Sequence, residues 1–226
     1  MTSSLPVLPD DTKAPGAHQV NCWCCGSDRT SDLFCPTCTA ILPIADTADY
    51  FQVLGLPRRL VIDPAALQRR YYELHRRWHP DLYQTGPQQA RSASLRNTAA
   101  VNRAYATLRD PVERGEYWLT LQGERLGANN NRVPPELAAL VFEVQEQLEE
   151  LRADPASDVL RRGVAGARDE LRDRERSLLD ALQANFAGWD APGANATALT
   201  QELKRTLSAL AYLRTLRRDV ERALEQ

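Results

Sequence analysis

Apolar residues recur every three to four positions over most of the chain after Asp49, which is the spacing of helices that bury one face. No stretch alternates apolar and polar residues as a half-buried strand would, so the chain is predicted to be all-α. The first four predicted helices cover about Tyr50–Leu54, Pro64–Trp78, Gln88–Arg109 and a short stretch that begins at Pro111 and carries Tyr117, Trp118 and Leu121.

Two of these helices show a clear apolar face. In the helix over 64–78 the positions are spaced four, three and four apart: Leu67, Tyr71, Leu74 and Trp78. In the helix over 88–109 the residues near one face are Leu95, Ala99, Val101, Tyr105 and Leu108.

Three longer helical patterns follow a segment rich in Gly and Asn, residues 123–134, that is interpreted as a linker. Their apolar stripes run along Leu137–Leu151, Leu160–Leu182 and Leu199–Val220. Short turns between them predict an antiparallel three-helix bundle over residues 135–226.

Asp-Pro pairs punctuate the helical patterns. Asp can cap a helix N-terminus, and Pro suits the first helical position because its missing N–H costs nothing there. Helix starts are therefore predicted at three places: Asp63-Pro64, Asp110-Pro111 and Asp154-Pro155.

Composition limits the possible functions. The chain has 226 residues, 43% of them hydrophobic, and a net charge of −2, which gives no global attraction to nucleic acid or to an anionic membrane. No apolar run reaches membrane-spanning length. Residues 1–20 have no apolar core and are interpreted as a disordered tail rather than a secretory signal or an Arg-rich transit peptide. We expect a cytoplasmic protein in a bacterium, or one of the mitochondrial matrix if the source is eukaryotic.

All five cysteines lie between Cys22 and Cys38, which marks a small module over residues 21–42. Cys22 and Cys25 form one pair with two residues between them, and Cys35 and Cys38 form another. Two such pairs can supply four thiolates to one tetrahedral metal, so we expect one structural zinc per chain. Disulfides and an iron site of the rubredoxin type are the alternatives. Cys24 has the wrong spacing and is expected not to be a ligand.

The tripeptide His79-Pro80-Asp81 follows the helix over 64–78 and forms a stiff polar tip, because the residue before a proline leaves the helical region. The arginines of this helix fall largely away from its apolar stripe and form a basic surface that could steer an acidic partner: Arg69, Arg70, Arg76 and Arg77.

Other interpretations of the tripeptide and these arginines remain open. The tripeptide could simply end a helix that the arginines make soluble. His75 and His79 could form a metal pair, although no third ligand is apparent. Nucleic-acid binding is disfavoured because Glu73 interrupts the basic residues.

Residues 49–121 resemble a J domain. The matching stretches are DYFQVLGL at 49–56, LHRRWHPD at 74–81, VNRAYATL at 101–108 and DPVERGEY at 110–117, which follow all four predicted helices in order. The resemblance implies a J domain over residues 47–122, in which His79, Pro80, Asp81 and the four arginines contact a chaperone ATPase of the heat-shock protein 70 class.

The architecture further resembles the HscB co-chaperones, with a J domain before a C-terminal three-helix bundle and no Gly/Phe-rich region. The N-terminal cysteine pairs look like the zinc-binding extension of eukaryotic-type members. The resemblance implies an ATPase activator without a catalytic site of its own, acting in iron–sulfur cluster assembly with an HscA-like chaperone and an IscU-type scaffold.

The family's scaffold-binding surface is an apolar and acidic patch on the bundle. By position, its counterparts here are Ala138, Ala139, Phe142, Glu143, Glu146 and Tyr212. The first two replace larger apolar residues of the family, and Phe142 and Tyr212 could instead belong to the bundle core. A J protein for another client and a zinc-ribbon binding protein are the alternative functions.

Overall fold

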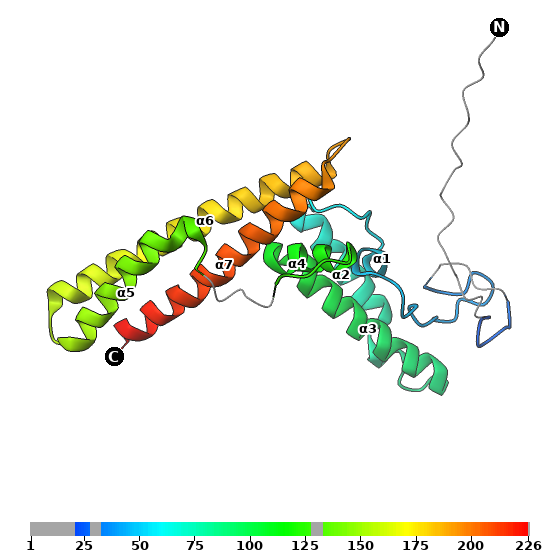
Figure 1. Cartoon of the computed structure of the whole chain (residues 1–226). Helices are drawn as coiled ribbons and strands as arrows, with labels where there is room; N and C mark the ends of the chain where they lie inside the picture. The colour runs from blue at the N-terminus through cyan, green and yellow to red at the C-terminus, as the bar shows by residue number, and fades with distance from the viewer. Residues whose placement is uncertain (1–20, 28–32, 128–132, 226) are drawn as a thin grey trace, which may run out of the picture. The chain divides into compact units, whose positions relative to one another are not determined.

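The computed structural model describes residues 21–27, 33–127 and 133–225, and within these ranges every regular element is helical apart from one isolated β-bridge (Figure 1). The all-α prediction is confirmed. The predicted tail over residues 1–20 lies outside the described residues, as do residues 128–132 of the predicted linker. No helix in the described ranges is both long and apolar enough to cross a membrane.

The helices have sharply defined bounds. The α-helices are α1 Tyr50–Leu54, α2 Pro64–Trp78, α3 Gln88–Arg109, α4 Pro111–Leu121, α5 Ala138–Ala153, α6 Asp158–Asp190 and α7 Ala196–Leu224. Two 3-10 turns, η1 and η2, cover Pro80–Tyr83 and Pro135–Leu137. The first three helices match the predicted ranges, and α4 begins at the predicted residue.

Two of the three Asp-Pro pairs start helices as predicted. The Asp63 carboxylate accepts from the Ala65 N–H, and the Asp110 carboxylate accepts from the two amides that follow Pro111. The prediction for Asp154-Pro155 is wrong. Asp154 closes α5, because its N–H donates to the Glu150 carbonyl, and α6 begins at Asp158 with Ser157 as its N-cap.

The described chain divides into two compact units. The first unit contains the segment up to Ala48 together with His75–Ala100, and the second contains Asp49–Leu74 and everything from Val101 onward. The division passes through α2 and α3, so each helix contributes one part to each unit.

In the first unit, α3 buries a partly polar face. Its fully buried positions include Ala93, Ser94 and Asn97, whereas Leu95 is 60% exposed. The prediction that Leu95 lies with the apolar face is therefore wrong, because Ser94 and Asn97 continue that face in its place.

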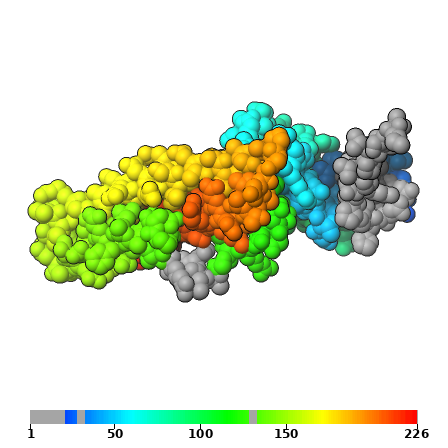
Figure 2. Space-filling view, turned by 45° about the horizontal axis from the view of Figure 1, so that its top comes forward, coloured from blue at the N-terminus to red at the C-terminus, as the bar shows by residue number. Residues whose placement is uncertain are grey.

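In the second unit, α6 and α7 form a long antiparallel pair (Figures 1 and 2). With 33 residues, α6 is about 50 Å long. The helix α5 packs against the first half of α6 and the second half of α7. This packing gives the core of the three-helix bundle, which contains Leu137, Val141, Val144, Leu148, Leu151, Val164, Ala167, Leu171, Ala209, Leu213, Leu216 and Val220.

The other half of the α6–α7 pair is covered by α4. Gly115 of α4 lies so close to α7 that a β-carbon there would be 3.3 Å from the side chains of Leu203 and Leu207. Trp118 of α4 meets Trp189 of α6 edge to face, with ring centroids 5.6 Å apart. The long helical pair is therefore a shared core for α4 and α5.

Polar contacts reinforce this packing. The Asp190 carboxylate, at the end of α6, accepts from the backbone N–H groups of Leu60 and Val61 at 3.0 and 2.8 Å. Arg114 of α4 is 6% exposed, donates to the Leu108 carbonyl at 2.9 Å and lies over the ring of Phe186. Burial lowers the pKa of Arg114.

Candidate functional site

The tripeptide His79-Pro80-Asp81 forms an exposed tip at the end of α2. His79 is the N-cap of η1, and its Nδ1 accepts from the Asp81 N–H at 3.3 Å. The same Nδ1 lies 3.4 Å from a carboxylate oxygen of Asp81. The side chains of His79 and Asp81 are 42% and 71% exposed, so both present hydrogen-bonding groups to solvent.

The backbone beneath this tip is fixed by α3. The Trp78 carbonyl, at the last residue of α2, accepts from the Ser94 and Thr98 hydroxyls at 2.6 and 3.0 Å. The Tyr83 hydroxyl donates to the Arg77 carbonyl at 3.1 Å. These bonds satisfy carbonyls that a helix end leaves unpaired, and they hold the loop as a defined structure.

The predicted basic residues of α2 differ in their surroundings. In the second unit, Arg69 is exposed, whereas Arg70 donates from Nε to the Leu54 carbonyl and from Nη1 to Glu73, both at 2.9 Å. Arg70 thus ties α1 to α2. In the first unit, Arg76 and Arg77 are both exposed, and the guanidinium of Arg77 lies 4.5 Å from the centre of the Phe34 ring.

The cysteine pairs form two nearly identical turns. The Gly26 N–H donates to the Cys22 carbonyl at 2.9 Å, and the Thr39 N–H donates to the Cys35 carbonyl at 2.8 Å. Gly26 and Thr39 both have positive φ, at 72° and 60°. Each turn thereby directs both of its sulfurs to the same side.

The four sulfurs fit a metal. The ligand atoms of Cys22, Cys25, Cys35 and Cys38 all lie within 4.8 Å of one another, and the Cys22–Cys38 and Cys25–Cys35 sulfurs are 3.6 Å apart. Sulfurs bonded tetrahedrally to zinc stand about 3.8 Å apart. Cys24 is exposed and outside this group, and its backbone N–H points to the Cys22 sulfur at 3.4 Å.

The Ser27 hydroxyl prepares two of these sulfurs for a cation. It lies 3.0 Å from the Cys25 sulfur and 3.3 Å from the Cys35 sulfur. Hydrogen bonding by Ser27 lowers the pKa of Cys25 and lowers that of Cys35 to about 5. Because the thiolate is the form that binds metal, this environment favours coordination by Cys25 and Cys35, whereas burial and the neighbouring thiols raise the pKa of Cys38.

Comparisons with known proteins agree with the motifs. The DnaJ domain model matches residues 49–117. The human iron-sulfur cluster co-chaperone protein HscB is 29% identical over 180 residues, which cover 77% of either chain. The mouse protein of the same name is 30% identical over 179 residues, which cover 77% of this chain and 76% of the relative. The chain belongs to the HscB family. The crystal structure of human HscB matches with a TM-score of 0.70 at 24% identity, over 89% of this chain and 97% of that chain, and so has the same fold.

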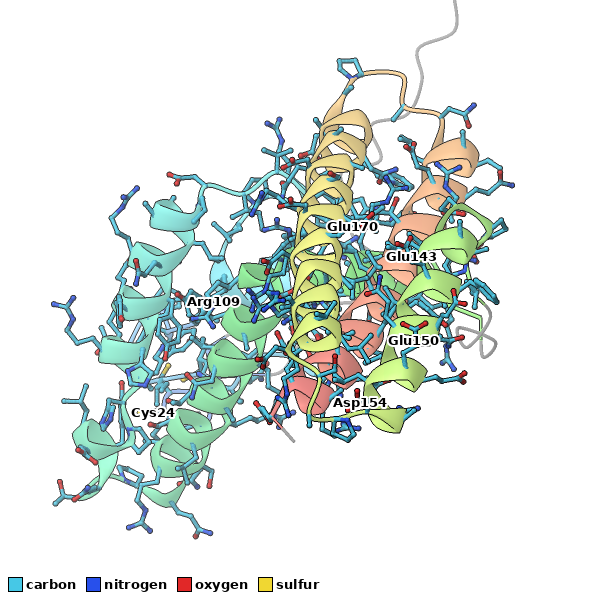
Figure 3. All side chains as sticks on the ribbon, turned by 90° about the vertical axis from the view of Figure 1, so that its left-hand side faces the viewer. Cys24, Arg109, Glu143, Glu150, Asp154 and Glu170 are labelled. Carbon is cyan, nitrogen blue, oxygen red and sulfur yellow. The ribbon has the colours of Figure 1, made fainter. Side chains whose placement is uncertain are left out.

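The residues predicted to form a scaffold-binding patch lie on α5 and α7. Ala138, Ala139, Glu143 and Glu146 are exposed on α5, and Figure 3 labels Glu143. Phe142 is 69% exposed and lies outside the bundle core. Tyr212 of α7 is half-buried and packs against that core. The core interpretation left open above therefore applies to Tyr212 in part and does not apply to Phe142.

Sequence reasoning missed the polar residues that support these sites. Ser94, Asn97 and Thr98 lie on one face of α3, at the spacing of one helical turn, and they hold the backbone around the tripeptide and the metal module. Asp190, which joins α6 to the α1–α2 connection, was missed as well. Nothing in the sequence separates such residues from ordinary surface residues, because their partners are carbonyls and amides distant along the chain.

Proposed function

We propose that this protein is a co-chaperone of iron–sulfur cluster assembly that activates an HscA-like heat-shock protein 70 and delivers an IscU-type scaffold to it. The observation that carries the proposal is the exposed His79-Pro80-Asp81 tip on a fixed backbone, in a chain of the HscB family. The mechanism is allosteric. The tip binds the hydrolysis-competent state of the ATPase more tightly than the other states. This difference in binding free energy shifts the conformational equilibrium of the ATPase toward hydrolysis.

The decisive test of the J domain is a single-turnover ATPase assay with an HscA-like chaperone. We expect His79→Gln to abolish stimulation, since it removes an imidazole that is 42% exposed, while the melting temperature stays unchanged. Arg103→Gln, at an exposed residue of α3, is the control and should stimulate normally. Full stimulation by His79→Gln would contradict the proposed role of the tripeptide.

The bundle is proposed to bind the scaffold through the surface around Phe142. A phenyl ring that is 69% exposed beside Glu143 and Glu146 offers an apolar anchor with an acidic border. Ala138, Ala139 and Tyr212 belong to the same proposed surface, and the small side chains of the two alanines reduce its apolar area.

Affinity measurements with an IscU-type protein test this surface. Phe142→Ala should weaken binding by about tenfold or more, the loss of roughly 1.4 kcal/mol or more that is expected for an interface hot spot. Val159→Ala, at a residue of α6 that is 68% exposed, removes a comparably exposed apolar side chain and should bind as the wild type does. Undiminished binding by Phe142→Ala would exclude this surface. No binding by the wild type would indicate a different client.

The tetracysteine site is proposed to hold one structural zinc ion. Four thiolates favour zinc over magnesium or calcium, and four protein ligands leave no open position for catalysis. Native mass spectrometry should show one zinc per chain. Intact protein with four free thiols and no metal would refute the assignment, and iron in place of zinc would favour the rubredoxin-type alternative.

A further inference from the structure

We propose that the metal module positions the chaperone-binding end of the J domain, with Phe34 holding the guanidinium of Arg77 beside the tripeptide. Phe34 is thus a positioning residue for the J-domain contact. The inference rests on the proposed function in one respect: the tripeptide end of α2 is taken to be the surface that meets the ATPase.

Phe34 and Arg77 make a direct contact between the module and α2. The Arg77 guanidinium lies over the half-buried Phe34 ring, 4.5 Å from its centroid. Arg77 is two residues before His79, and stacking on an aromatic face orients a flat guanidinium. A long exposed side chain that would otherwise sample many rotamers is thereby held in a limited set of directions.

Phe34 in turn depends on the metal site. It directly precedes Cys35, and its backbone pairs with Ile41 in the β-bridge, next to the Leu42 N–H bond to the Leu33 carbonyl at 3.0 Å. Among the described residues, the apolar cluster around the cysteines has Cys22, Cys35 and Leu42 as its buried members. Since two of these three residues are metal ligands, the module has little core of its own and the metal must supply most of its folding free energy.

Asn97 anchors the same module to α3. Its Nδ2 donates to the Leu42 carbonyl and its Oδ1 accepts from the Ile44 N–H, both at 2.9 Å, and the side chain is fully buried. Ser94, one helical turn before Asn97, and Thr98, the residue after it, hold the Trp78 carbonyl at the end of α2. One face of α3 thus binds both the exit of the metal module and the base of the tripeptide loop.

Charge adds a further contact to this arrangement. Arg96 of α3 forms an ion pair with Asp46, in the segment that follows the module. Together these contacts make the metal module, the first half of α3 and the last turn of α2 one hydrogen-bonded cluster within the first unit. Loss of the metal should therefore loosen the structure around Arg77 and the tripeptide loop as well as around the cysteines.

The test compares variants that keep all four ligands. Phe34→Leu removes the ring and keeps apolar bulk, whereas Phe34→Tyr keeps the ring. With an HscA-like chaperone, Phe34→Leu should raise the half-saturating concentration about two- to fivefold, the effect of one exposed cation–π contact, without changing the maximal stimulated rate. Phe34→Tyr should restore the wild-type value, and both variants should retain one metal per chain.

The double variant separates positioning from general damage. If Phe34 acts through Arg77, then Phe34→Leu should cost nothing further in an Arg77→Ala background, because the positioned group is already gone. The inference would be overturned if the losses of the two substitutions were additive, or if Phe34→Leu had the half-saturating concentration of the wild type. Normal stimulation by the wild-type protein would still support the proposed function in either case.

Hydrogen exchange provides a readout that needs no chaperone. Removal of the metal from the wild-type protein with a chelator should speed amide exchange in the last turn of α2 and in η1, residues 75–83. Unchanged exchange there would refute the coupling. This measurement decides the inference even if the wild type fails to stimulate any heat-shock protein 70, the result that would refute the proposed function.

Discussion

The carboxylate of Asp190 joins α6 to the connection between α1 and α2, and its removal should destabilise the second unit. The perturbation is Asp190→Ala, which deletes the acceptor for the Leu60 and Val61 amides at 3.0 and 2.8 Å. A hydrogen bond to a charged group contributes about 1.5–3 kcal/mol net. Leu60 is fully buried, so its amide would lose its partner without gaining water, whereas Val61 is 53% exposed and can be hydrated.

An opposing term reduces this estimate. A carboxylate in the last turn of a helix is unfavourable by about 0.3–1 kcal/mol, which Asp190→Ala recovers. We therefore expect a net loss of about 1–3 kcal/mol. Asp190→Asn keeps one oxygen acceptor and should lose roughly half as much.

Urea denaturation measures the total, and amide hydrogen exchange locates it. The Leu60 and Val61 amides should exchange faster in Asp190→Ala than in the wild type. Asp180→Ala is the matched control, because Asp180 is an exposed acid on the same helix. A change below about 0.5 kcal/mol with unchanged exchange at both amides would show that these bonds contribute nothing, since surface substitutions typically fall within that range.

Three further substitutions test other features. Arg114→Ala should cost about 2–4 kcal/mol in urea denaturation, because it leaves a cavity and an unpaired Leu108 carbonyl, whereas Arg114→Met keeps most of the volume and should cost less. Burial raises the pKa of Glu116, so its ionised form opposes folding; Glu116→Gln should stabilise by less than about 1 kcal/mol at pH 7, and the gain should vanish near about pH 4. Thr39 has a φ of 60° where the equivalent turn has Gly26, so Thr39→Gly should strengthen metal retention in a chelator competition by about two- to fivefold.

Each of these has a clear contrary result. Equal stability of Arg114→Ala and the wild type would show that the buried guanidinium contributes nothing net. A gain for Glu116→Gln that grows as the pH falls would reverse the sign of the burial argument. Weaker metal retention by Thr39→Gly would mean that the threonine side chain contributes more than its backbone strain costs.

The helices were predictable because each carries local signals. Asp63 and Asp110 precede prolines that begin helices, and the stripe of α2 buries Leu67, Leu74 and Trp78 as its spacing predicts. The Asp154 prediction failed because Asp serves equally well after a helix, and the chain offered Ser157 as a cap. A local signal that is compatible with two roles is resolved only by its neighbours.

Polar side chains account for the remaining errors and omissions. The buried face of α3 was predicted to include Leu95 because only apolar residues were considered. Ser94 and Asn97 are buried instead, and their side chains form hydrogen bonds with backbone carbonyls. Periodicity cannot show that a polar side chain has a buried partner fifty residues away. The cysteine ligands were predictable for the opposite reason, since their spacing encodes both the turns and the chemistry.

The division of the α6–α7 pair between α4 and α5 has a consequence for how HscB-type chains can be rearranged. An excised bundle would expose the surface of Leu203, Leu207 and Phe186 that α4 covers, and a J domain grafted from another co-chaperone would have to reproduce the glycine at position 115 to dock there. The J domain of this protein is therefore not an exchangeable cassette. Exchange of the parts on either side of the segment before α5 would break the packed interface between α4 and α7. Substitutions in α4 and at the start of α7 must therefore remain compatible with each other.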